Sequence, residues 1–284
     1  CHTKMSDMDG VSEVKDLVKR AHDWGHKAIA ITDHGVVQAF PDANHYIETL
    51  DKDDPFKVIY GVEGYLVDDL QDVAVNEKGQ SLKGTYVVFD LETTGFSSAK
   101  DKIIEIGAVK VENGEITDKY STFVNPKIPI PFRITQLTSI TDEMVMESPE
   151  IETILPQFLK FVGDAVLVAH NASFDVSFIE ENCRQQGIEP DFTSVDTVGL
   201  ARVLLPTLSK FKLNVVAKAL NISQEHHHRA VDDARVTAEI YVKFIQMLEE
   251  RGIETLDQMN HFGAHNAEAI RKMPSYHVIV LAKN

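Results

Sequence analysis

Two acidic residues, Asp90 and Glu92, end an apolar stretch that has the composition of a buried strand, Tyr-Val-Val-Phe-Asp-Leu-Glu-Thr-Thr-Gly at residues 86–95. Because side chains alternate between the two faces of a strand, both carboxylates point the same way. Such a pair is costly to bury unless its charge is compensated, and a divalent cation is the natural compensation. Oxygen ligands favour Mg²⁺ or Mn²⁺. Taken alone, the pair would equally suit a solvated strand end.

A third carboxylate, Asp175, follows a second apolar strand at 165–169 and lies on a helix expected at 174–187. Asn171 has the residue type and position of a helix N-cap. Phe178 and Ile179 lie three and four residues after Asp175, on the same helix face. Asp175 therefore lies on a surface that faces the core, where a carboxylate needs a partner. By itself it would also fit an aspartate that interacts with the helix dipole.

A fourth carboxylate belongs to a segment with three histidines, residues 226–228, followed by Asp232 and Asp233. The pairs His227/Asp232 and His228/Asp233 have the same spacing, so the register is ambiguous. On a helix over 230–250, Asp232 shares its face with polar residues: Arg235, Glu239 and Lys243. Asp233 shares its face with residues suited to a core: Ala230, Thr237, Ile240 and Phe244. The pattern favours His228 and Asp233, and leaves His226 and His227 to a surface loop.

Over residues 84–250 these segments resemble the DEDDh exonuclease family. The matching pieces are Asp90-Leu91-Glu92-Thr93-Thr94-Gly95, Asn171-Ala172-Ser173-Phe174-Asp175, and His228 with Asp233-Ala234. The resemblance implies an RNase H-like sheet and two ions, Mg²⁺ or Mn²⁺, held by Asp90, Glu92, Asp175 and Asp233. It also implies 3′→5′ hydrolysis to nucleoside 5′-monophosphates, with Asp90 bridging both ions. His228 would accept a proton from the attacking water, and the pKa of histidine suits that role.

Three further residues, Thr93, Thr138 and Asn171, are substrate-binding candidates. Residues 137–141 resemble the family segment that packs on the terminal nucleotide, with Ser139 where glycine is usual. An ordinary loop-to-helix turn would fit this segment as well. Asp196, in Val-Asp-Thr, is also typical of the family, and we assign it no catalytic role.

The flanking segments resemble a different family, the PHP domain. The matching pieces are His2-Thr3 with Asp9-Gly10, residues 31–35, Gly61-Val62-Glu63, and residues 276–284. The resemblance implies a metal cluster held by His2, Asp9, His34, Glu63 and His277. Mixed imidazole and carboxylate ligands suit Zn²⁺ or Mn²⁺. The family motif begins His-x-His, and its first histidine would precede Cys1, so we expect weak affinity and a mainly structural role for the ion.

The predicted fold is α/β: an RNase H-like exonuclease domain at 84–250, with a mixed sheet flanked by helices, inserted in an incomplete PHP α/β domain formed by 1–83 and 251–284. The polar stretch 69–84 predicts a linker, and Asn113-Gly114 predicts a hairpin between strands at 102–112 and 116–124. Residues 253–276 are weakly patterned, and 277–282 suggest a buried strand. We expect 84–250 to fold and cleave alone.

The composition limits the partners. The chain has 284 residues, a net charge of −16 and two cysteines, which fits a reducing cytoplasm and excludes a disulfide framework. No apolar run reaches the roughly 18 residues of a membrane span. Because a duplex binder usually carries a basic face, most DNA affinity should come from elsewhere. The chain lacks an initiator Met, so we expect a fragment.

A PHP domain interrupted by a DEDDh exonuclease resembles part of a bacterial replicative DNA polymerase. This arrangement implies the proofreading function, with the partners being a single-stranded or mispaired DNA 3′ end, the remainder of the polymerase polypeptide and other replisome components. Two alternatives remain open. An RNA-trimming nuclease would use the same residues, because the metals act on phosphate rather than on the sugar. A non-catalytic module is disfavoured because all four acidic positions and the histidine are intact.

Overall fold

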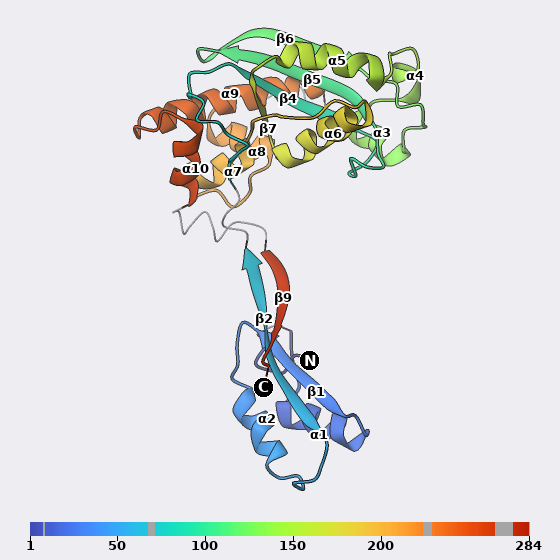
Figure 1. Ribbon diagram of the computed structural model, residues 1–284, viewed down its shortest axis with the longest axis vertical. Helices are drawn as coiled ribbons and strands as arrows, with labels where there is room; N and C mark the ends of the chain where they lie inside the picture. Colours follow the sequence, from blue (N-terminus) through green and yellow to red (C-terminus); the bar gives the residue numbers. More distant parts are fainter. Residues whose placement is uncertain (8, 68–71, 224–228, 265–274, 284) are drawn as a thin grey trace. The chain divides into compact units, whose positions relative to one another are not determined.

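The computed structural model describes residues 1–7, 9–67, 72–223, 229–264 and 275–283 (Figure 1). The chain forms two compact units, one of residues 1–69 with 273–284 and one of residues 70–272. The first contains a three-stranded sheet and the second a six-stranded sheet. Among the helices of the described residues, none has both the length and the apolar character that crossing a membrane requires.

The first unit consists of α1 (Val14–Asp23), β1 (Ala28–His34), α2 (Phe40–Ile47), β2 (Lys57–Val67) and β9 (Ser275–Leu281). Strand β1 pairs in parallel with β2, and β9 pairs with the other edge of β2 in antiparallel fashion. Apolar residues of α1 at helical spacing, Val14, Val18 and Ala21, pack with Ile31 and Phe56 in a small core.

Strand β9 forms close to its predicted position, but the prediction that it is buried is wrong. Its apolar side chains are exposed, from 37% for Val278 to 63% for Tyr276. The strand lies at the edge of its sheet. An apolar strand sequence specifies pairing and a preference for burial, whereas burial itself depends on a second layer of structure.

The six-stranded sheet of the second unit has the order β3-β8-β7-β4-β5-β6. The strands are β3 (Ala74–Val75), β4 (Tyr86–Thr93), β5 (Ile103–Glu112), β6 (Glu115–Phe123), β7 (Val166–Ala169) and β8 (Ser194–Asp196). Strand β7 is parallel to β4 and β8, and the other pairings are antiparallel. The predicted hairpin is confirmed: Asn113 and Gly114 have φ values of 53° and 79°, as a two-residue turn between twisted strands requires.

Helices cover both faces of this sheet (Figure 1). On one side, α5 (Ile151–Val162) and α6 (Ala172–Gln185) pack on Val87, Phe89 and Leu91 of β4. On the other, Tyr86 and Val88 face α7 (Thr197–Leu204), α8 (Leu213–Ala219) and α9 (Ala230–Glu249). The short helices α3 (Phe132–Thr138) and α4 (Asp142–Val145) enclose a separate small core around Ile104. Strand β8 and helices α3, α4 and α7 were not predicted.

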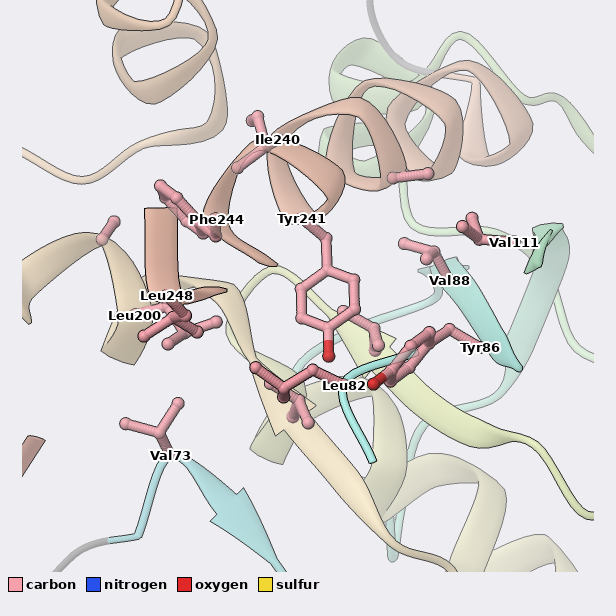
Figure 2. Packing of buried hydrophobic residues seen from close by; sticks show 14 of the residues in the cluster. Val73, Leu82, Tyr86, Val88, Val111, Leu200, Ile240, Tyr241, Phe244 and Leu248 are labelled. Atoms are coloured by element: carbon pink, nitrogen blue, oxygen red, sulfur yellow. The ribbon is translucent and has the colours of Figure 1, made fainter. Parts of the chain in front are cut away.

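The stretch predicted as a linker is, over residues 72–84, part of the second unit. Figure 2 shows Val73 and Leu82 in one cluster with Tyr241, Phe244 and Leu248 of α9. Strand β3 lies in this stretch and pairs with β8. The polar composition of this stretch predicted a linker, but a few buried apolar side chains are enough to attach a segment to a core.

Residues 253–264, the described first part of the weakly patterned stretch, also belong to the second unit and contain α10 (Leu256–Ala264). Its Leu256 and Met259 are buried in the same cluster. The backbone N–H of Leu82 donates to the carbonyl oxygen of Glu254 at 2.8 Å, so the two flanks of the unit bind each other. The compact unit, 70–272, is therefore wider at both ends than 84–250.

Candidate metal centres

Three carboxylates meet where β4 ends. Asp90 and Glu92 lie on one side of β4, and Asp233 lies in the first turn of α9. One oxygen of each lies within 4.8 Å of the others. All three residues are partly buried. Of the two neighbouring aspartates, Asp233 is the one that helix α9 directs into this group, because Ala230, Ala234 and Thr237 on its own face are buried.

The fourth predicted ligand, Asp175, lies beside this group. It is 3% exposed, and its Oδ1 accepts a hydrogen bond of 3.1 Å from the backbone N–H of Leu91, the residue between Asp90 and Glu92. Helix α6 follows β7, which pairs with β4 in parallel, so the first turn of α6 comes out at the same end of the sheet. Four carboxylates therefore converge from β4, α6 and α9.

The electrostatics of this cluster are those expected of a site that could hold a cation. Burial, and then the charge of Asp175, raise the pKa of Asp90 well above its usual value. Burial, and then the charge of Glu105, raise the pKa of Glu92 to about 7. These carboxylates repel one another when they are all ionised, and a small divalent cation would compensate their negative charge. Their oxygen atoms are also the ligands that such a cation prefers, so the residues present fit a divalent metal ion.

The predicted histidine, His228, and its neighbours His226 and His227 lie outside the described residues. The substrate-binding candidates are placed as follows. The hydroxyl of Thr93 donates to the carbonyl oxygen of Gly95 at 2.6 Å, and that of Thr138 donates to Ile134 at 3.0 Å. Both threonines are buried, whereas Asn171 is exposed. Ser139 has a φ of 61°, a conformation that glycine adopts most easily.

Asn171 stands at the N-cap position of α6, but its side chain does not cap the helix. Its φ is 76°, and its side chain makes no capping hydrogen bond. The carboxylate of Asp196 serves instead: it accepts from the backbone N–H of Asn171 at 2.8 Å and of Ala172 at 3.2 Å. Asp196 also caps α7, accepting from Val198 and Gly199 at 3.1 Å each. The capping of α6 by Asp196 could not be predicted from the sequence, because the two are about 25 residues apart and no local motif connects them.

The first unit contains a second cluster. Nε2 of His2 lies 2.8 Å from Glu63, and Nε2 of His34 lies 2.8 Å from Asp9. His277 hydrogen-bonds to Glu63 through Nδ1. The structure thus brings the five predicted residues together, because β9 pairs with β2 and places His277 opposite Tyr65. His2, His34 and Glu63 offer donor atoms within 4.8 Å of one another.

Hydrogen bonds between histidine and carboxylate set the electrostatics of this second cluster. The bond to Asp9 raises the pKa of His2, and the bond to His2 lowers the pKa of Asp9. The bond to His277 lowers the pKa of Glu63. The tyrosine hydroxyl of Tyr65, which the sequence did not suggest, lies 3.1 Å from Nδ1 of His34. Ionised carboxylates beside imidazoles are a donor set that fits a transition-metal ion.

Two family patterns match this sequence. The pattern of the exonuclease family matches residues 87–241, more than half of the chain. The pattern of the PHP domain matches residues 1–127. The matches overlap, and the structure places residues 86–123 in the six-stranded sheet of the second unit.

Curated relatives match over the whole chain. It is 54% identical over 284 residues to the PolC-type DNA polymerase III of Clostridium perfringens and 48% identical over 283 residues to that of Caldanaerobacter subterraneus subsp. tengcongensis. The corresponding protein of Staphylococcus aureus is 45% identical over 285 residues. The chain spans about a fifth of the length of these relatives.

Solved structures are similar to a large part of this chain. Exonuclease X in complex with 5′ overhanging duplex DNA is 29% identical, with a TM-score of 0.50, and covers 63% of this chain and 99% of its own. The nuclease domain of 3′hExo, a DEDDh family member bound to rAMP, is 20% identical with a TM-score of 0.52, over 58% of this chain and 93% of its own. The similarity to this second structure shows the fold, which is that of the RNase H-like exonucleases. Because the exonuclease pattern matches more than half of its residues, the chain belongs to the exonuclease family.

Proposed function

We propose that this chain is a 3′→5′ DNA exonuclease and acts as the proofreading part of a PolC-type replicative DNA polymerase. The observation that carries the proposal is the group of Asp90, Glu92 and Asp233, with donor oxygens within 4.8 Å of one another beside buried Asp175. Four carboxylates that come together from three elements would form a preorganised site for divalent cations. The similarity to PolC-type polymerases over the full chain supports the biological setting.

The chain's own residues would act in distinct ways. Asp90, Glu92, Asp175 and Asp233 would hold two Mg²⁺ or Mn²⁺ ions, which supply electrostatic stabilisation to the attacking and leaving oxygens of a phosphodiester. His228, one residue before Arg229 at the start of α9, would take the proton of the attacking water. Asn171, exposed at the turn before α6, is the best placed of the three substrate-binding candidates to contact the terminal nucleotide.

Because the chain is strongly acidic, other parts of a polymerase would have to supply most of the DNA binding. At a net charge of −16 it has little electrostatic attraction of its own for phosphate. We infer that the remainder of the polymerase polypeptide, with other replisome components, delivers the 3′ end. Weak binding would also restrict cleavage to ends that leave the polymerase site, as mispaired ends do.

The test is the polarity of degradation of single-stranded DNA labelled at either end, with and without Mg²⁺. We expect loss of nucleotides from the 3′ end as 5′-monophosphates, inhibition by EDTA and recovery with Mn²⁺ or Mg²⁺. Asp90→Ala, folded by circular dichroism, should remove nearly all turnover. Digestion from the 5′ end, or cleavage in EDTA, would rule the proposal out.

RNA trimming is the second candidate. It is favoured by one observation, the shared fold of a nuclease domain solved with rAMP. Oligoribonucleotides of the same sequence, assayed beside the DNA, separate the two. We expect faster turnover of DNA, and a preference of tenfold or more for RNA would replace the proofreading assignment.

For the first unit we propose a structural ion, Zn²⁺ or Mn²⁺, held by His2, Asp9, His34, Glu63 and His277. The cluster joins both ends of the chain, since His2 precedes β1 and His277 lies on β9. An ion here would fasten β9 to the edge of its sheet. This role requires no phosphoesterase activity from the chain.

A further inference from the structure

A fifth carboxylate, Glu105, is buried close to the exonuclease site. It stands alone in the apolar run Ile-Ile-Glu-Ile-Gly-Ala-Val of β5 and is 1% exposed. In the pairing of β4 with β5 it is the cross-strand partner of Glu92. A buried carboxylate next to a metal-binding carboxylate is costly, so its presence calls for a specific partner.

The partner of Glu105 is the first turn of α9. Its Oε1 accepts hydrogen bonds from Nε and Nη2 of Arg229 at 3.0 and 2.8 Å. Its Oε2 accepts from the backbone N–H of Ala230 at 3.3 Å. Both carboxylate oxygens therefore bind the start of the helix. The guanidinium carbon of Arg229 also lies 5.0 Å from the ring centroid of Phe123, which fixes its direction.

A second contact of β5 with the same turn is independent of charge. Gly107, two residues after Glu105, is the cross-strand partner of Asp90. A Cβ at Gly107 would lie 2.0 Å from the backbone nitrogen of Val231 and 2.1 Å from the carbonyl carbon of Ala230. The first turn of α9 thus rests directly on the backbone of β5, and a larger side chain would displace it.

The two contacts have one geometric consequence. The cross-strand neighbours of Asp90 and Glu92 are the residues that hold the start of the helix carrying Asp233. We propose that Glu105, Arg229 and Gly107 form a positioning device that sets the place of Asp233 relative to Asp90 and Glu92, and so sets the affinity of the exonuclease site for its cations. The inference rests on the proposed metal-dependent function of that site.

The test measures Mn²⁺ binding to the full chain by calorimetric titration without DNA, well below the melting temperature. Asp90→Ala gives the background from the cluster of the first unit. We expect Arg229→Gln and Glu105→Gln each to weaken Mn²⁺ binding about tenfold, because loss of a residue that orients a metal ligand commonly costs 10- to 100-fold. The double variant should be no weaker than either single variant, since the two side chains act as a pair.

The sign of the Arg229→Gln effect separates positioning from simple charge. Removing a positive charge near a cation site should strengthen Mn²⁺ binding if Coulomb attraction alone mattered. Positioning predicts the opposite, weaker binding. Arg235→Gln is the matched control, because Arg235 lies on the same helix and pairs with Glu239, and it should leave Mn²⁺ affinity unchanged.

Unchanged or tighter Mn²⁺ binding by Arg229→Gln would overturn the inference, as would an equal loss in Arg235→Gln. If Glu105→Gln does not fold, Arg229→Gln still decides, since Arg229 has a side chain 45% exposed and its replacement leaves the core intact. Degradation of DNA is assayed separately. A protein that binds Mn²⁺ as predicted but does not cleave DNA would contradict the proposed function and leave the positioning device standing.

Discussion

Asp175 and Leu91 are joined by a hydrogen bond: the backbone N–H of Leu91 donates to the Oδ1 of Asp175, 3.1 Å away. This bond fixes the first turn of α6 to the middle of the Asp90-Leu91-Glu92 segment. It gives Asp175 a structural role in addition to its proposed role as a ligand. Burial raises the pKa of Asp175 well above its usual value, and the bond from Leu91 partly opposes that rise.

The two roles of Asp175 are separable by substitution. Asp175→Asn keeps an oxygen for the Leu91 N–H but loses the charge, whereas Asp175→Ala leaves that donor without an acceptor. We expect both variants to lose nearly all exonuclease turnover. Asp175→Asn should be more stable than Asp175→Ala by about 1–3 kcal/mol, the cost of a buried unsatisfied donor. Urea unfolding of the two variants measures this difference, and equal stability would contradict the role of the bond.

The raised pKa of Glu92 predicts how the metal-free protein responds to pH. Its pKa is about 7 in the folded state against 4.5 unperturbed. As pH rises from 4.5 to 7, the unfolded chain loses this proton before the folded chain, so folding becomes less favourable, and the full penalty holds above pH 7. Removing the group by Glu92→Gln should therefore stabilise the protein at pH 8, by on the order of 2–3 kcal/mol, and have little effect near pH 4.

The measurement is the melting temperature of Glu92→Gln minus that of the unsubstituted protein, in EDTA, across this pH range. The difference should grow with pH. Added Mg²⁺ should reduce it at pH 8, because the ion stabilises only the protein that retains Glu92. A difference that shrinks as pH rises would show that Glu92 is not under electrostatic strain.

The choice of His228 rather than His227 is testable by a paired substitution. His228→Ala should lower turnover by about 10²–10⁴-fold, the usual contribution of a general base, whereas His227→Ala should cost little. Asp232→Asn and Asp233→Asn form a matched pair on α9, of which only the second should abolish turnover. Single-turnover rates on the same DNA measure all four. A larger loss for His227→Ala would reverse the register.

The boundaries of the exonuclease unit lead to a revised expectation about truncation. A chain of residues 84–250 lacks buried residues from both flanks: Val73, Ala74, Leu82, Ile253, Leu256 and Met259. Burying a large apolar side chain contributes roughly 1.5–3 kcal/mol to the free energy of unfolding. The contributions lost with these residues are together comparable to the whole stability of a typical domain, about 5–15 kcal/mol. We expect residues 72–264 to unfold cooperatively and residues 84–250 to be largely unfolded, as judged by thermal circular dichroism.

The metal cluster of the first unit should be independent of exonuclease activity. His34→Ala removes an imidazole that binds Asp9 and contacts Tyr65, so it should lower bound Zn²⁺ or Mn²⁺ and the melting temperature while leaving turnover intact. His22→Ala is a suitable control, because His22 pairs with Asp54 away from the cluster. Bound metal is counted by atomic emission. Loss of exonuclease turnover with the fold intact would show that the two centres are coupled.

The sequence by itself determined the elements that carry the chemistry. Alternation along β4 placed Asp90 and Glu92 on one side, the Asn113-Gly114 pair fixed a hairpin, and helical spacing along α9 separated Asp233 from Asp232. These features are local, because strand and helix periodicities set side-chain direction within a few residues. The candidate ligands and the α/β fold could be predicted for the same reason.

Only the tertiary structure decided the bounds of the exonuclease unit, the exposure of β9 and the polar contacts between distant residues. The polar stretch 72–84 and the weakly patterned residues after Gly252 join the exonuclease core through Leu82, Leu256 and a few others, which no local pattern reveals. Apolar β9 lies exposed at a sheet edge, because burial requires a covering layer. Asp196 caps α6, and Glu105 accepts hydrogen bonds from Arg229. Both contacts join residues far apart in sequence, and only the folded chain brings such polar groups within hydrogen-bonding distance.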